Sequence, residues 1–173
     1  MQVTDANNNP VSNAIVTLRV RPVAFSLGSG CTIDVDRNVP TQRATYCSED
    51  SNANSSLDAG EDGKRVLTTV TTAGQCGVGS PTVYTGTSDG ALTPQNSVAG
   101  SVPSTVTTDA TGTAPFSLTY LKASAIWVVD KISATVSVNG TESGTSTIFQ
   151  LPVTTADVTL PGTCHIPDSP FSY

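Results

Sequence analysis

The chain has 173 residues, of which only 13 % are charged and 5 % aromatic, and it carries a net charge of −6 with a pI near 4.4. This acidity argues against nucleic-acid and anionic-membrane partners, and no apolar run is long enough to span a bilayer. The length predicts a single domain over residues 1–173, and the abundance of Thr, Ser, Val and Gly predicts an all-β chain with almost no helix.

The first segment is rich in turn-forming residues and leads into an alternating strand. Asn, Asp and Pro crowd positions 3–12, a composition typical of turns. The strand that follows has one apolar and one polar face, formed respectively by Ala14, Val16, Leu18 and Val20 and by Thr17, Arg19 and Arg21. No signal peptide precedes this segment, so we expect Met1 to be an expression start on a fragment of a longer, exported chain.

Residues 22–63 show no clear alternation, and we expect them to be irregular. They include an acidic stretch, Glu49 to Asp62, that holds five of the fourteen carboxylates of the chain and no Lys or Arg. Unneutralised carboxylates packed this closely repel one another, because like charges disfavour ionisation of their neighbours. A bound cation would relieve that repulsion.

The spacing within the acidic stretch is that of a calcium loop of EF-hand type. Counted from Asp50, oxygen-bearing side chains fall at loop positions 1, 3, 5, 9 and 12, and the apolar Leu57 falls at position 8. The predicted calcium ligands are Asp50, Asn52, Asn54, Ser56, Asp58 and Glu61. Position 6, normally Gly, is Ser55 here, and because a left-handed Ser costs roughly 1 kcal/mol we expect a weakened site.

Two further interpretations concern the same carboxylates. Asp58 and Glu61 could share a second calcium site with Asp62 and the distant Asp89. Alternatively, the stretch is a solvated loop whose Asx side chains hydrogen-bond to nearby backbone without a metal. We favour the calcium loop, since spacing, ligand types and the apolar position all agree with it.

Four cysteines are spaced too irregularly for a zinc site and predict two disulfides formed in an oxidising compartment. Three pairings of Cys31, Cys47, Cys76 and Cys164 are compatible with the sequence. We favour Cys31–Cys47 with Cys76–Cys164, because the first pair flanks a short excursion just before the acidic loop. Buried free thiols are the alternative.

The rest of the chain contains clearer strand signals. Residues 64–72 predict a strand, whereas residues 73–97 are rich in Gly, Ser and Thr and indicate loop or edge structure. Alternating segments then cover residues 114–120, residues 131–138 and, after the hairpin signal Asn139-Gly140, residues 147–151. Short alternating strands separated by turns predict an antiparallel sandwich of two sheets.

Two segments carry a family resemblance. Residues 3–18 read Val-Thr-Asp-Ala-Asn-Asn-Asn-Pro-Val-Ser-Asn-Ala-Ile-Val-Thr-Leu, and residues 108–118 read Thr-Asp-Ala-Thr-Gly-Thr-Ala-Pro-Phe-Ser-Leu. They resemble the two signatures of the bacterial Ig-like domains of the invasin/intimin type, which occur as repeats in surface adhesins. Asn8 departs from the family, which usually has Gly there. The resemblance implies an Ig-like antiparallel β-sandwich with a long irregular insertion over residues 22–105, which would carry the calcium loop and three cysteines.

The resemblance implies the context of a surface adhesin, and the residues themselves imply a sandwich braced by calcium and disulfides. We therefore expect a non-catalytic structural or adhesive module, located outside the cell or on its surface. Its expected partners are neighbouring domains of a longer surface protein and a host or environmental glycan or protein. We expect no nucleic-acid partner and no direct insertion into a membrane.

Two other functions compete with this expectation. A calcium-dependent carbohydrate-binding module would stack sugars on aromatic side chains, for which the candidates are Trp127, Tyr46, Tyr84 and Tyr120. However, a Trp that enters a strand of a sandwich usually packs in the core. An enzyme is the weakest alternative, because the single histidine, His165, lies in a Pro-rich tail and no nucleophile elbow or phosphate-binding loop occurs.

Overall fold

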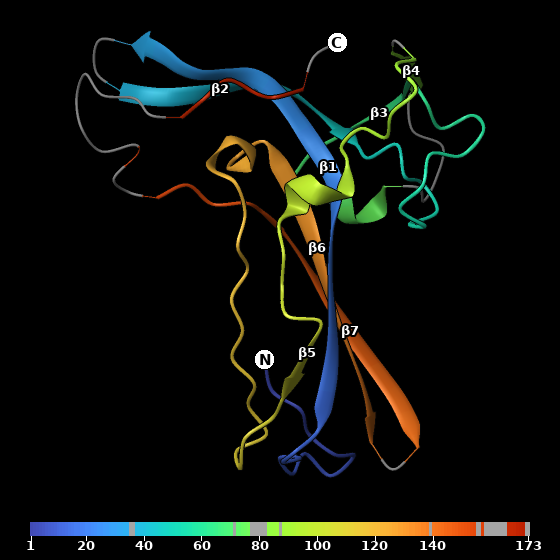
Figure 1. Ribbon diagram of the computed structural model, residues 1–173. Helices are drawn as coiled ribbons and strands as arrows, with labels where there is room; N and C mark the ends of the chain where they lie inside the picture. Colours follow the sequence, from blue (N-terminus) through green and yellow to red (C-terminus); the bar gives the residue numbers. More distant parts are fainter. Residues whose placement is uncertain are drawn as a thin grey trace.

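The computed structural model describes residues 1–34, 37–70, 72–76, 83–86, 88–138, 140–154, 157 and 166–171, with only the backbone described for some strand residues. Within these residues the fold is all-β, as predicted, and helical structure is confined to three short 3-10 turns. Figure 1 shows the strands as one long, twisted sheet, with β1 running along most of its length.

The main sheet has the strand order β4-β3-β2-β1-β6-β7, and β5 also pairs with β1. All of its strand pairs are antiparallel. The strands are β1 (Ile15–Asp34), β2 (Arg37–Cys47), β3 (Lys64–Thr68), β4 (Val83–Thr85), β5 (Thr105–Thr107), β6 (Val128–Val138) and β7 (Thr141–Gln150). The 3-10 turns are η1 (Ala73–Gln75), η2 (Asn96–Ala99) and η3 (Lys122–Ser124).

Strand β1 is long enough to contribute to separate hydrophobic clusters along its length. Its first half alternates as predicted, with Val16 and Leu18 buried in one core. Its second half, Val23 to Leu27, is buried on both faces, between Ala73 of η1 on one side and Phe171 on the other. A strand that is covered on both faces need not alternate in sequence. The prediction of irregular structure is therefore wrong for the parts of residues 22–47 that lie in β1 and β2.

A second layer of extended chain covers one face of the sheet. Isolated bridges join Gln2 to Thr113 and Ser101 to Thr119. Residues 114–120, predicted to be a strand, keep the expected alternation of buried and exposed side chains but form no continuous ladder. Pro115, which has no backbone N–H to donate, lies within this segment.

The C-terminal segment, residues 166–171, packs back against β1. The backbone N–H of Gly30 donates to the Asp168 carboxylate at 2.8 Å, and the Ser169 hydroxyl donates to the Ser26 carbonyl at 2.7 Å. The Phe171 ring lies 4.9 Å from the Phe25 ring, centroid to centroid. These contacts close the core over the second half of β1.

Candidate functional site

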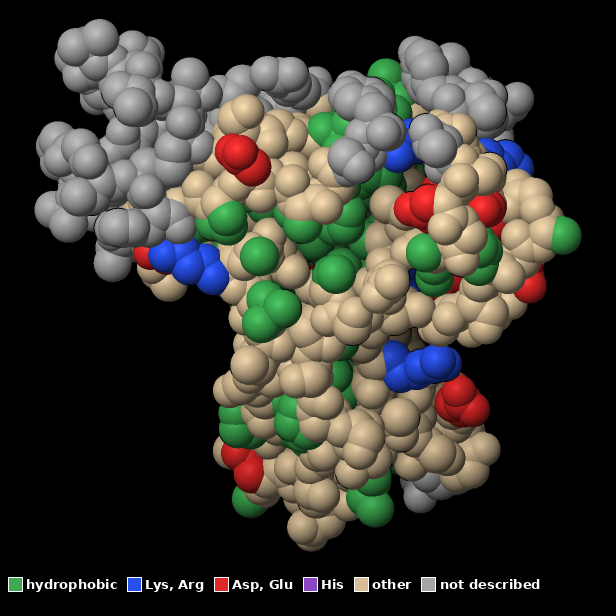
Figure 2. Space-filling view, turned by 45° about the horizontal axis from the view of Figure 1, so that its top comes forward, with side chains coloured by type: hydrophobic (Ala, Val, Ile, Leu, Met, Phe, Trp, Pro, Cys, Tyr) green, Lys and Arg blue, Asp and Glu red, His purple; other side chains and the backbone are tan. Residues whose placement is uncertain are grey.

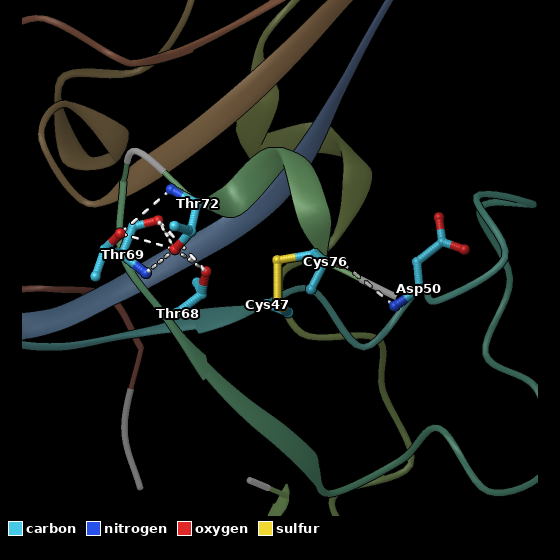
Figure 3. The surroundings of a disulfide bond; sticks show 7 residues. Cys47, Asp50, Thr68, Thr69, Thr72 and Cys76 are labelled. Atoms are coloured by element: carbon cyan, nitrogen blue, oxygen red, sulfur yellow. Dashed lines mark hydrogen bonds between the residues drawn. A yellow bond between two sulfur atoms is a disulfide. The ribbon is translucent and has the colours of Figure 1, made fainter. Parts of the chain in front are cut away.

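The acidic loop connects β2 to β3 and is described in full. Cys47 ends β2, and Asp50 follows on the turn beyond it with its carboxylate pointing away from the disulfide (Figure 3). Asp50 and Glu61, the first and last of the predicted loop ligands, are 4 % and 5 % exposed. Two buried carboxylates in a loop without Lys or Arg require other partners, because burial disfavours an uncompensated charge.

Backbone N–H groups of the loop itself supply those partners. The Asp50 carboxylate accepts hydrogen bonds from the N–H of Asn54 at 3.0 Å and of Ser55 at 3.1 Å. The Glu61 carboxylate accepts from the N–H and hydroxyl of Ser51, at 2.9 and 2.6 Å, and from the N–H of Asp58 at 3.0 Å. The chain is thereby wrapped around the two carboxylates that begin and end the predicted ligand set.

The middle of the predicted ligand set also converges. The side-chain amides of Asn52 and Asn54 both donate to one oxygen of Asp58, each at 2.7 Å. Their own carbonyl oxygens accept backbone N–H groups two residues further along. The side chains at loop positions 3, 5 and 9 therefore lie close together, but they meet through the amide N–H groups of the two Asn residues and not through the Asn oxygens that would bind calcium.

The sharp turn that was expected at Ser55 is present. Ser55 has a φ of 68° and Ala53 a φ of 63°, both in the left-handed region that favours glycine. Two left-handed residues other than glycine in one short loop store local strain, and such strain persists only where surrounding contacts maintain it.

The pKa values of Glu61 and Glu49, two carboxylates of the acidic stretch, are shifted in opposite directions. Burial raises the pKa of Glu61, but hydrogen bonds from the Ser51 hydroxyl and from the Asp58 and Ser51 backbone outweigh it, so the pKa lies below its usual value. Glu49 behaves in the opposite way. Burial raises its pKa, and the hydrogen bonds that it accepts from Thr93 and Gly63 do not compensate for that burial.

Glu49 is a site residue that sequence analysis missed. It is 5 % exposed, and its carboxylate accepts the backbone N–H of Gly63 at 3.1 Å and of Thr93 at 2.9 Å. Its neighbours include Asp62 and Asp89, whose charges also raise its pKa. Because Glu49 precedes the twelve-residue ligand pattern, the spacing template gave it no role.

The structure brings together part of the proposed second site. Asp62 accepts the backbone N–H of Asp89 at 3.0 Å and of Gly90 at 3.1 Å, although 27 residues separate Asp62 from Asp89. The neighbours of this pair include Glu49. The sharing of Asp58 and Glu61 between two ions stays a prediction.

The donor chemistry of the loop fits a hard cation. Asp50, Asn52, Asn54, Asp58 and Glu61 offer only carboxylate and amide oxygens, the ligand type that calcium prefers. Within the described parts of the chain, no three His, Cys, Asp or Glu side chains are grouped closely enough to hold a metal ion. As described, the carboxylates are occupied by hydrogen bonds within the loop, so calcium binding stays a prediction.

The disulfide beside the loop joins Cys47 to Cys76, with 5.5 Å between their Cα atoms (Figure 3). Both favoured pairings, Cys31–Cys47 and Cys76–Cys164, are therefore wrong. The reason is the return of the chain: β3 runs antiparallel to β2, and η1 then brings Cys76 back to the end of β2. Cys164, His165 and the side chain of Cys31 lie outside the described residues.

The aromatic candidates for sugar stacking are mostly enclosed. Trp127 is fully buried and donates its indole N–H to the Pro167 carbonyl at 3.0 Å, as expected for a core Trp. Tyr46 is 6 % exposed, and the Tyr120 hydroxyl donates to the Pro152 carbonyl at 2.7 Å. The side chain of Tyr84 lies outside the described residues.

Asp130 is a second acidic feature that the sequence did not reveal. It lies in β6 opposite Pro22 of β1 and Phe149 of β7, is fully buried, and neither of its carboxylate oxygens has a hydrogen-bond partner. Burial raises its pKa to about 8. A pKa in this range favours the protonated carboxyl of Asp130 at pH 7.

Comparison of the chain with protein-family models, with curated proteins and with solved structures gave no match. Across the described residues, no helix has the length and apolar character needed to cross a membrane. The likeness to invasin/intimin-type Ig-like domains rests on the two sequence segments alone.

Proposed function

We propose that this chain is a non-catalytic, extracellular structural or adhesive module of a bacterial surface protein, braced by calcium and by disulfides. The observation that carries the proposal is the fixed geometry of the Asp50–Glu61 loop, whose first and last carboxylates are buried and held by backbone N–H groups. A loop ordered in this way loses little further entropy when an ion binds.

The surroundings of the loop support a bracing role. The Cys47–Cys76 disulfide ties one end of the loop to η1, and Glu49 and Asp62 tie the loop to residues 89–93. Figure 2 shows a face, outside the grey parts, covered mainly by backbone and by side chains that are neither hydrophobic nor charged, with charged side chains only in small groups. Such a surface suits a spacer or adhesive module that neighbours other domains of a longer protein.

Calcium titration monitored by isothermal calorimetry tests this function. We expect one-to-one binding with a Kd of about 10⁻⁴–10⁻³ M, which is typical of extracellular modules, and no comparable response to magnesium. Glu61→Gln keeps the shape of the side chain but removes the charge, and should weaken binding at least about tenfold.

The matched control is Glu142→Gln, which removes an exposed carboxylate on β7 and should leave the affinity unchanged. Wild-type protein that releases or absorbs no heat with calcium, or equal weakening by both variants, would contradict the bracing role.

A further inference from the structure

Strand β7 forms an edge of the sheet that has little of the usual protection against pairing with another strand, namely a single charged side chain near one end. It is the last strand beside β6, and Figure 1 shows its outer side without a neighbouring strand in the described parts of the chain. Residues 141–147 are exposed. The backbone N–H and C=O groups on the outer side of such a strand are available to another chain.

The two edges of the sheet differ. At the other edge β4 has only three residues, and a short strand offers little to pair with. Strand β7 has ten residues, Thr-Glu-Ser-Gly-Thr-Ser-Thr-Ile-Phe-Gln, with no Pro, Lys or Arg. Its ladder with β6 is continuous from Val129–Gln150 to Val138–Thr141, without a bulge. Natural edge strands usually carry one of these blocking features.

We propose that β7 is a self-association edge, which pairs antiparallel with β7 of a second copy of this chain to give one continuous sheet. The position of charge on the strand is compatible with this partner. Glu142 is the one charged residue of β7 and lies near one end. In an antiparallel pair centred on Thr145, Glu142 faces the partner's Ile148, so the two carboxylates are separated by about 20 Å along the strands.

The same register gives favourable neighbours. Thr145 lies opposite its own copy and Ser143 opposite the partner's Thr147, and cross-strand hydroxyl pairs of this kind stabilise sheets. Thr141 faces the partner's Phe149. Because Thr141, Ser143 and Thr145 also line a groove of about 700 Å³ to which Val136 and Val138 contribute, this Phe would lie beside a groove with some apolar lining.

The association should be weak and sensitive to salt. One strand pair is small compared with the surface of about 1,200–2,000 Å² that specific, stable complexes bury. Each copy also carries a net charge of −6, so the copies repel one another at low ionic strength. We therefore expect a monomer–dimer equilibrium that moves toward the dimer as protein concentration and salt increase.

Sedimentation velocity of the full chain, from micromolar to millimolar concentration, tests the proposal. Thr145→Lys and Thr145→Glu each place like charges directly opposite each other, and each should weaken self-association at least about tenfold. An equimolar mixture of the two variants places opposite charges across the pair and should restore dimers. Restoration also shows that both variants remain folded. Thr107→Lys on β5 makes the same charge change away from β7 and should have no effect.

Three results would overturn the proposal: a wild-type chain that stays monomeric throughout, undiminished dimers in the Thr145 variants, or a mixture that does not recover association. If the wild type stays monomeric, the outer side of β7 would instead be available to a strand from a different protein. Hydrogen exchange provides the site-specific check, since amides within residues 141–149 should become protected as concentration increases.

Discussion

At the scale of single residues, the backbone conformation of Ser55 should affect the stability of the acidic loop. Its φ of 68° is left-handed, so Ser55→Gly should relieve strain and stabilise the protein by up to about 1 kcal/mol. The backbone N–H that donates to Asp50 is retained, so calcium affinity should increase as well. Urea unfolding measures the gain. Ser56→Gly, one residue further along, should give none, and equal effects of the two changes would refute the strain argument.

Asp130 makes a prediction about pH. Its pKa is raised from 3.8 to about 8 in the folded state, so folded protein holds the proton over a range in which unfolded protein releases it. This group therefore makes stability decrease as pH rises from about 4 to about 8, and its contribution levels off above that range. Asp130→Asn should remove this loss and be more stable than wild type at pH 8 by at least about 1 kcal/mol.

Chemical unfolding of wild type and Asp130→Asn at pH 4, 6 and 8 would measure this difference. The comparison cancels the titration of the other groups, since both proteins share them. A constant difference between the two proteins across these pH values would show that Asp130 does not hold a proton at neutral pH in the fold.

At the scale of elements, the Cys47–Cys76 disulfide fixes the end of β2 to η1. The two cysteines are separated by 29 residues, and the chain-entropy model gives about 3–4 kcal/mol for a loop of this size. Replacing both cysteines by Ala should reduce the free energy of unfolding by this amount, as measured in urea. A loss below about 1 kcal/mol would mean that the acidic loop holds this end without the disulfide.

The C-terminal segment depends on Gly30. A Cβ atom on this residue would overlap the carbonyl oxygens of Ile166 and Pro167. Gly30→Ala should therefore displace the segment, cost roughly 1–3 kcal/mol of stability, and alter the fluorescence of Trp127, whose indole donates to Pro167. Gly144→Ala is the control, because its added Cβ would approach the Thr135 side chain at 3.2 Å and the Ala134 carbonyl oxygen at 3.4 Å, without the overlap that arises at Gly30. Unchanged Trp fluorescence in Gly30→Ala would contradict this docking.

Sequence patterns predicted the elements that have one solvated face. The strand over residues 14–21 alternates because water covers one of its faces, and it is confirmed. The hairpin around Gly140 is also confirmed, but it was predicted from its turn residues, since β7 is exposed throughout residues 141–147. The second half of β1 was missed because both of its faces are buried, which removes the alternation. The disulfide partner of Cys47 was also missed, since it depends on how β3 and η1 return to β2.

For the candidate site, the ligand spacing placed the left-handed turn at Ser55 and the proximity of Asn52 and Asn54 to Asp58. Calcium binding by these residues stays a prediction. Glu49 and Asp130 were not found, because their roles come from burial by distant segments rather than from local spacing. Burial by segments that are distant in the sequence cannot be predicted from the spacing of neighbouring residues.

At the scale of the whole molecule, the chain forms a long sheet whose β2–β3 end is held by a disulfide and by carboxylates bound to backbone N–H groups. Calcium binding at the Asp50–Glu61 loop would add further contacts at this end and stabilise the folded state through mass action. Because the loop follows directly on β2, the effect of the ion should extend to global unfolding and not only to the loop.

The most direct measurement of this claim is the thermal unfolding midpoint of the wild-type chain in excess calcium and in excess chelator. Calcium at about 100 times its Kd should add about 2.7 kcal/mol to the free energy of unfolding, so the midpoint should increase by several degrees. Magnesium at the same concentration should have little effect. An identical midpoint in calcium and in chelator would contradict the account and leave the acidic loop as a hydrogen-bonded turn without a metal.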